Sequence, residues 1–240
     1  MNSKFEDINQ VPARRFHEIQ VDFLNLLSED LVDIGVSGNR AESIANALFA
    51  SMCNQELHYH TPIHILEIFN FAHENSIDLS PEQKIAIWFH DAIYDVKNKP
   101  GSNSNESLSA QLTYALLRPY VETTTIVDVC GLITATELHL SEYCGEDAKL
   151  VLDLDLYSFA MDDLYFISCG HAIADEYSHI PYDDYMKGRL AFFKALNAKT
   201  SIYRTPLFKE KFEAIARENI EKEILILELY EKHFQAGIGD

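Results

Sequence analysis

Apolar residues recur every three or four positions along nearly all of this 240-residue chain. Such spacing places them together on one face of an α-helix. Three sets show it: Phe16, Ile19, Phe23 and Leu26; Ile65, Ile68, Phe69 and Ala72; Phe208, Phe212 and Ile215. No segment alternates apolar and polar residues between hairpin turns, as strands would. The sequence therefore predicts an all-α fold.

Few residues in the sequence mark helix ends or loops between the periodic segments. Ser80-Pro81 predicts a helix start, with Ser80 as the N-cap and Pro81 at the first helical position. Residues 96–105 are the most turn-rich segment, and a second loop is expected at 141–145. Because there is no internal repeat, low-complexity tract or long linker, we predict a single domain over 1–240.

The charge of the chain restricts its partners. Lys and Arg number 19 against 38 Asp and Glu, for a formal charge of −19. Such a protein repels phosphate backbones and anionic membranes, which argues against a nucleic-acid polymer or a membrane as partner. A small anionic substrate would need a local positive charge, such as a bound metal.

The sequence also bears on location. The first 15 residues are polar and predict no secretory signal, and no apolar run approaches the roughly 18 residues of a membrane span. The four cysteines form no CxxC pair. We therefore expect a cytoplasmic protein.

Histidines gather before residue 65. His60 and His64 are four residues apart, so on a helix they would lie on one face. Neutral imidazoles at this spacing are typical metal ligands. The alternative is that they cap a helix or lie on the surface.

A second polar feature interrupts an apolar run. His90-Asp91 follows Ile85–Phe89, where a buried helix is expected. A buried carboxylate without a partner is costly, and a metal ion would compensate for it. The alternative is a salt bridge at Asp91 and a core histidine at His90.

Two further acids, Asp153 and Asp155, lie within the apolar run Val151–Leu156. On a helix they would face different sides, so at most one is expected to bind a metal while the other orients a histidine. Nitrogen and oxygen donors without thiolate suit Mn, Fe, Co, Ni, Mg or Zn.

Six segments together resemble the HD superfamily of metal-dependent phosphohydrolases, most closely a bacterial family. In order along the chain they are Tyr59–His64, Ile87–Asp95, Ser104–Ala110, Thr134–His139, Leu152–Leu156 and Ile202–Thr205. The string WFHDAIYD is the most specific. The resemblance covers roughly residues 50–220 and implies an all-α HD-domain helical bundle.

The resemblance also implies a ligand set. It assigns metal binding to His64, His90, Asp91 and Asp155, with one or two divalent ions. Asp155 is preferred by alignment of the whole motif, although Asp153-Leu154 repeats the same Asp-Leu step and leaves the choice open. The spacing of His60 and His64 is similar to that of cyclic-nucleotide phosphodiesterases, which implies that His60 is a general acid.

Other roles are implied less directly. Glu106 and His139 are candidates for a second metal; the alternatives are a helix cap and a surface histidine. Candidate substrate-binding residues are Tyr94, Lys97, Arg189, Tyr203 and Arg204. The two arginines could grip a phosphate bidentately or form ordinary salt bridges.

The chain departs from the family pattern at several positions. Leu57 and Asp175 stand where arginine is expected, Thr61 where asparagine is usual, and Glu137-Leu138 where a basic residue is usual. Each change removes a positive charge or a donor from the region where a substrate phosphate would bind.

The implied activity is hydrolysis of a phosphate ester of a nucleotide or related small molecule by metal-activated water. Asp91 or Asp155 would accept the proton of the water, and His60 would protonate the leaving oxygen. The partner is then a small phosphorylated substrate, and a homo-oligomer is compatible with this. Two alternatives remain: a di-iron HD-type oxygenase, which needs Glu106 and His139 as ligands, and a non-catalytic nucleotide-sensing module.

Overall fold

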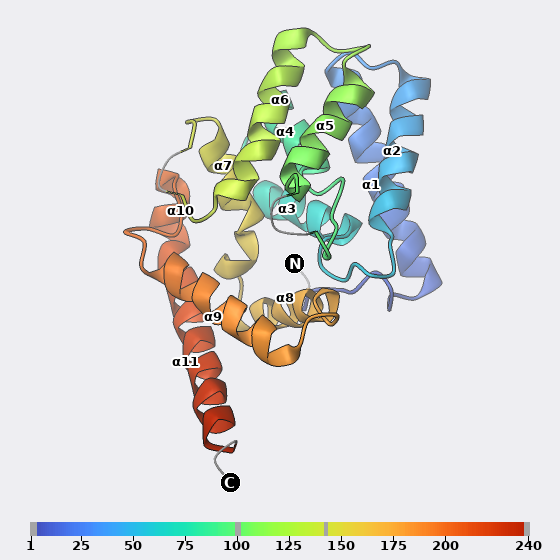
Figure 1. Ribbon diagram of the computed structural model, residues 1–240. Coiled ribbons are helices and arrows are strands. Elements are labelled where there is room, and N and C mark those ends of the chain that lie inside the picture. Colours follow the sequence, from blue (N-terminus) through green and yellow to red (C-terminus); the bar gives the residue numbers. More distant parts are fainter. Residues whose placement is uncertain (1–3, 99–101, 142–143, 238–240) are drawn as a thin grey trace. The chain divides into compact units, whose positions relative to one another are not determined.

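The computed structural model describes residues 4–98, 102–141 and 144–237. Every regular element in these ranges is a helix, which confirms the all-α prediction (Figure 1). Residues 99–101 and 142–143, parts of the two predicted loops, lie outside them. No helix within these ranges is both long and apolar enough to cross a membrane.

The described residues group into two compact units: Glu6–Asp155 form the first, and Lys4, Phe5 and the residues from Leu156 on form the second. The first unit contains α1 (Ala13–Asp33), α2 (Gly38–Met52), α3 (Pro62–Glu74), α4 (Pro81–Phe89), α5 (Asn105–Leu117), α6 (Thr123–Ala135), the 3-10 turn η1 (Thr136–Leu138) and α7 (Ala148–Asp155). The second contains η2 (Tyr157–Ala160), α8 (Asp163–Glu176), α9 (Tyr182–Asn197), α10 (Pro206–Lys211) and α11 (Glu213–Gly237).

The start of α4 is the one that the sequence predicts. Ser80 Oγ accepts a hydrogen bond from the Gln83 backbone N–H, and Gln83 Oε1 accepts one from the Ser80 N–H. Pro81 occupies the first turn, where its missing N–H costs nothing. This reciprocal capping box confirms the predicted helix boundary.

Two predicted apolar faces are wrong in detail. In α1 the buried residues are Ile19, Phe23, Leu27 and Leu31, whereas Leu26 is 43% exposed. The step after Phe23 is four residues instead of three, as an average of 3.6 residues per turn allows.

The second error lies near the end of the chain. Phe208, Phe212 and Ile215 do not share one helix, because α10 ends at Lys211 and α11 begins at Glu213. Phe212 has φ −123°, outside the helical range. Ile215 is consequently 41% exposed while Phe208 is buried.

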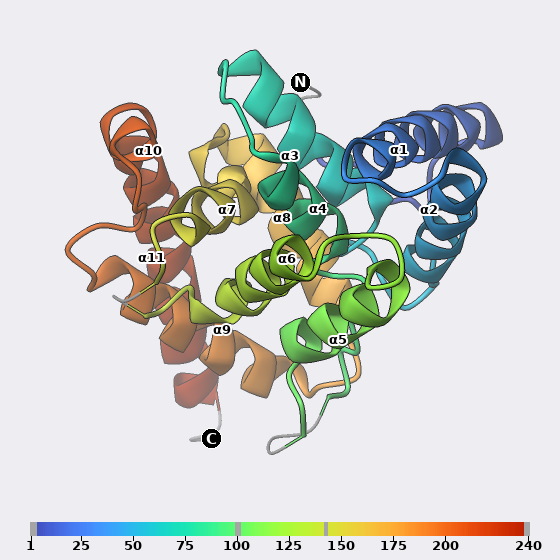
Figure 2. The same ribbon diagram turned by 90° about the horizontal axis from the view of Figure 1, so that it is seen from above.

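Helix α4 is the centre of the first unit. It packs against α1, α3, α5, α6 and α7, which surround it in Figures 1 and 2. Trp88 is fully buried, and its Nε1–H donates to Asp30 Oδ2 over 2.7 Å, while Lys84 Nζ donates to Asp30 Oδ1. Because α4 is enclosed, the residues that follow its last turn also lie in the interior.

In the second unit, α11 packs against α9, α10 and η2. The buried Asn219 side chain donates to the carbonyls of Phe159 and Met161. Arg189 of α9 pairs with Glu223 of α11, Nε to Oε1 2.7 Å, and its guanidinium lies over the Phe193 ring. These contacts tie the helices of this unit together.

Candidate metal centre

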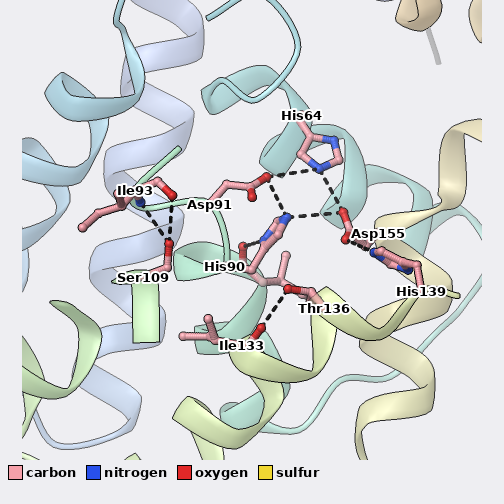
Figure 3. Close-up of polar contacts among 10 residues, drawn as sticks. His64, His90, Asp91, Ile93, Ser109, Ile133, Thr136, His139 and Asp155 are labelled. Atoms are coloured by element: carbon pink, nitrogen blue, oxygen red, sulfur yellow. Dashed lines mark hydrogen bonds and ion pairs between the residues drawn. The ribbon is translucent and has the colours of Figure 1, made fainter. Parts of the chain in front are cut away.

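Four sequence-predicted ligands come together in the first unit, although they are far apart along the chain (Figure 3). His64 is in the first turn of α3, which begins at Pro62. His90 caps the C-terminus of α4 and Asp91 follows it; Asp155 is the last residue of α7. The side chains of His64, His90 and Asp91 are 1%, 3% and 8% exposed.

The distances between donor atoms match those expected around one ion. Asp155 Oδ1 lies 3.3 Å from Nε2 of both His64 and His90. Asp91 Oδ2 lies 2.9 Å from His90 Nε2 and 4.0 Å from His64 Nε2. Ligands about 2.1 Å from a common metal are about 3.0 Å apart when adjacent in an octahedron and about 4.2 Å apart when opposite. His64, His90 and Asp91 therefore form a buried group that could hold a metal ion.

A backbone hydrogen bond orients the ring of His90 so that its Nε2 faces the cluster. Its Nδ1 lies 2.8 Å from the Ile87 carbonyl oxygen, so Nδ1 carries the proton of that hydrogen bond. Its buried Nε2 has no aligned hydrogen-bond partner despite the nearby carboxylates. Once it loses its proton, this nitrogen would offer a lone pair to a cation held between the two carboxylates.

The electrostatics favour a positive charge at the same point. Burial opposes the charged form of His90, but the carboxylates of Asp91 and Asp155 raise the pKa of His90 well above its usual value. Burial likewise opposes ionisation of Asp155, yet the charge of His90 and hydrogen bonds from His139 and His64 hold the Asp155 pKa well below its usual range. A divalent cation would take the place of the proton on His90 Nε2.

His64 and Asp91 have the protonation states that metal binding needs. Burial lowers the pKa of His64, which favours the neutral imidazole. Burial would raise the pKa of Asp91, but the charges of His90 and His60 lower it on balance. The donor set is thus a neutral imidazole, two carboxylates and an imidazole that needs only to lose a proton.

Asp155 belongs to this cluster, and Asp153 does not lie in it. Both are on α7, where two residues differ by about 200° around the axis. Asp153 is fully buried on another side of the helix. The orientation of α7 therefore brings Asp155 to His64 and His90, and its role as the metal ligand stays a prediction.

His139 and Glu106, the candidates for a second metal, are placed differently. His139 follows η1, and its Nε2 lies 2.8 Å from Asp155 Oδ2. Glu106 is half-buried in the first turn of α5, and within the described ranges no hydrogen bond or ion pair joins it to the cluster.

His60, the candidate general acid, lies beside the cluster. Its ring stacks on Tyr94 with centroids 3.6 Å apart and planes 14° apart, and its centroid is 6.1 Å from that of His64. The structure thus brings two predicted functional residues face to face. Lys97 instead pairs with the exposed Glu56.

The other candidate substrate-binding residues belong to the second unit. Arg189 is engaged by Glu223, as described above. Tyr203 is buried, and its hydroxyl donates to the Leu156 carbonyl over 3.2 Å. Arg204 is half-buried next to it in the chain. Substrate binding by these three residues stays a prediction.

Sequence reasoning gave no role to Ser109. This fully buried residue of α5 accepts a hydrogen bond from Ile93 N–H at 3.0 Å and donates to Ile93 O at 3.2 Å (Figure 3). It holds the turn that follows Asp91. The available signal was the position of this serine in a segment noted only for its family resemblance.

In comparisons with known proteins, no family model, curated protein or solved structure matches the chain.

Proposed function

We propose that the protein is a metal-dependent phosphohydrolase of the HD type that acts on a nucleotide or a related small phosphate ester. One observation carries the proposal: two imidazoles and two carboxylates from α3, the residues just after α4 and the end of α7 converge in one cluster, with a third imidazole beside them. The resemblance of the sequence segments supports the choice of phosphate chemistry.

The metal would be held by His64, His90, Asp91 and Asp155. When bound, a divalent ion supplies a water of lowered pKa and neutralises charge on a phosphoryl oxygen. Asp91 would accept a proton from that water, because its carboxylate borders the cluster, 2.9 Å from His90 Nε2.

His60 would donate a proton to the leaving oxygen. Its imidazole lies outside the donor set but one ring away from His64, within reach of a substrate bound at the cluster. The stack on Tyr94 restricts rotation of the ring. A placed acid of this kind contributes roughly 10²–10⁴-fold to the rate.

Metal analysis of the purified protein, followed by a phosphatase screen with added Mn, Co, Ni or Mg, tests the proposal. We expect about one ion per chain and turnover of a small phosphate ester, with both lost in Asp91→Asn. Asp128→Asn, an exposed acid on α6, is the matched control and should keep both. A wild-type protein that binds no ion, or binds one and hydrolyses no phosphate ester, would contradict the proposal.

A further inference from the structure

The two oxygens of the Asp155 carboxylate have different partners. Oδ1 faces His64 and His90, 3.3 Å from each Nε2, whereas Oδ2 contacts His139 Nε2 at 2.8 Å. Figure 3 shows His139 on the far side of Asp155 from the other two rings. A carboxylate bonded through one oxygen can still turn about its last C–C bond, and a hydrogen bond to the second oxygen stops that rotation.

Asp155 needs such support because of its place in the chain. It is the final residue of α7, where helices fray, and its side chain is 17% exposed, more than those of His64, His90 and Asp91. His139, in contrast, follows directly on a 3-10 turn that packs against both α6 and α7. Within that turn, Thr136 Oγ1 donates to the Ile133 carbonyl over 2.8 Å and is buried.

The same contacts argue against His139 as a ligand of a second ion. Asp155 Oδ1 lies 3.3 Å from Nε2 of both His64 and His90, whereas His139 contacts the other oxygen of the same carboxylate, Oδ2. A second ion would need further donors, and Glu106 is not joined to His139 within the described ranges.

We propose that His139 is a positioning residue: it donates a hydrogen bond to Asp155 Oδ2 and so orients Oδ1 toward a single metal ion. This inference rests on the proposed function, since it requires that the cluster binds a metal. Under this proposal the site holds one metal ion, and His139 orients the ligand Asp155 without binding the ion itself.

Titration of the full-length protein with Co²⁺, followed by calorimetry and by the visible d–d absorption of the bound ion, tests this role. We expect one Co²⁺ per chain in the wild type and in His139→Ala, with affinity about 10- to 100-fold lower in the variant and a changed d–d spectrum. His139→Gln, whose amide N–H can replace the Nε2 donor, should recover most of the affinity. Asp128→Asn serves as the unaffected control.

Three other results would each overturn the positioning role of His139, and they can be told apart. Two ions in the wild type and one in His139→Ala would make His139 a ligand of a second metal. Equal affinity and spectra in the wild type and His139→Ala would show that Asp155 needs no support. A wild type that binds no Co²⁺ or other divalent ion would overturn both this inference and the proposed function, whereas the first two results leave metal binding intact.

Discussion

A single buried hydroxyl, Ser109 Oγ, bonds to both the N–H and the carbonyl oxygen of Ile93, at 3.0 and 3.2 Å. It thereby connects α5 to the turn that carries Asp91, two residues earlier in the chain. Ile93 lies between the end of α4 and the start of α5, so neither helix supplies a partner from its own backbone ladder.

Ser109→Ala should therefore destabilise the protein. Removal of the hydroxyl leaves the Ile93 N–H without its partner, which costs about 1–3 kcal/mol. Urea unfolding measures this loss. The matched control is Ser43→Ala on the exposed side of α2, for which a change within about 0.5 kcal/mol is expected. Equal effects of the two substitutions would contradict the role given to Ser109.

Because Tyr94 stacks on His60, two substitutions of Tyr94 should affect activity differently. Tyr94→Phe keeps the ring and should keep most of the activity, whereas Tyr94→Ala frees the imidazole and should lower kcat more than it raises KM. His60→Ala should lower kcat by roughly 10²–10⁴-fold. Steady-state kinetics on the substrate found in the screen decide this. A Tyr94→Ala protein with a normal kcat would show that the stack does not position His60.

Metal binding should raise the stability of the fold, because the four donors come together only in the native state. At a free ion concentration about 100 times Kd, the gain is about 2.7 kcal/mol. Thermal unfolding of chelator-treated protein with and without Mn²⁺ measures it. Asp91→Asn should lose this gain in stability, and Asp128→Asn should retain it. If no divalent ion changes the Tm of the wild type, the metal site is contradicted.

Glu67 predicts a pH dependence that is independent of the cluster. This carboxyl of α3 is 6% exposed, and its Oε2 has no hydrogen-bond partner in the described structure. Burial raises the Glu67 pKa, Glu6 and Glu74 reinforce the shift, and Arg15 opposes it. Because the folded-state pKa is above the unfolded one, this group favours the folded state at low pH, and that contribution is lost as pH rises from about 4.5 through the folded-state pKa.

Glu67→Gln should accordingly be more stable than the wild type at pH 8, and the difference should shrink as the pH falls toward 4.5. Urea unfolding across this range, with the exposed Glu42→Gln as control, measures the difference. A Glu67→Gln variant that is less stable than the wild type at pH 8 would show that Glu67 has a compensating partner.

Much of the local structure follows from the sequence. The helical period and the Ser80-Pro81 start are properties of short segments, because backbone hydrogen bonds and capping involve residues only three or four positions apart. The same local logic singled out His90 and Asp91, since a polar pair at the end of an apolar run needs a compensating partner wherever the helix lies.

Tertiary structure decided what no short segment contains. The packing of α7 against α3 and α4 brought Asp155 to His64 and His90. The contacts of α1 buried Leu27 in place of Leu26, and a break at Phe212 turned Ile215 to the surface. The His139 contact with Asp155 and the Ser109 contact with Ile93 likewise join separate elements. Spacing along the chain determines which residues share a helical face, whereas the packing of helices that are distant in sequence determines what each face meets.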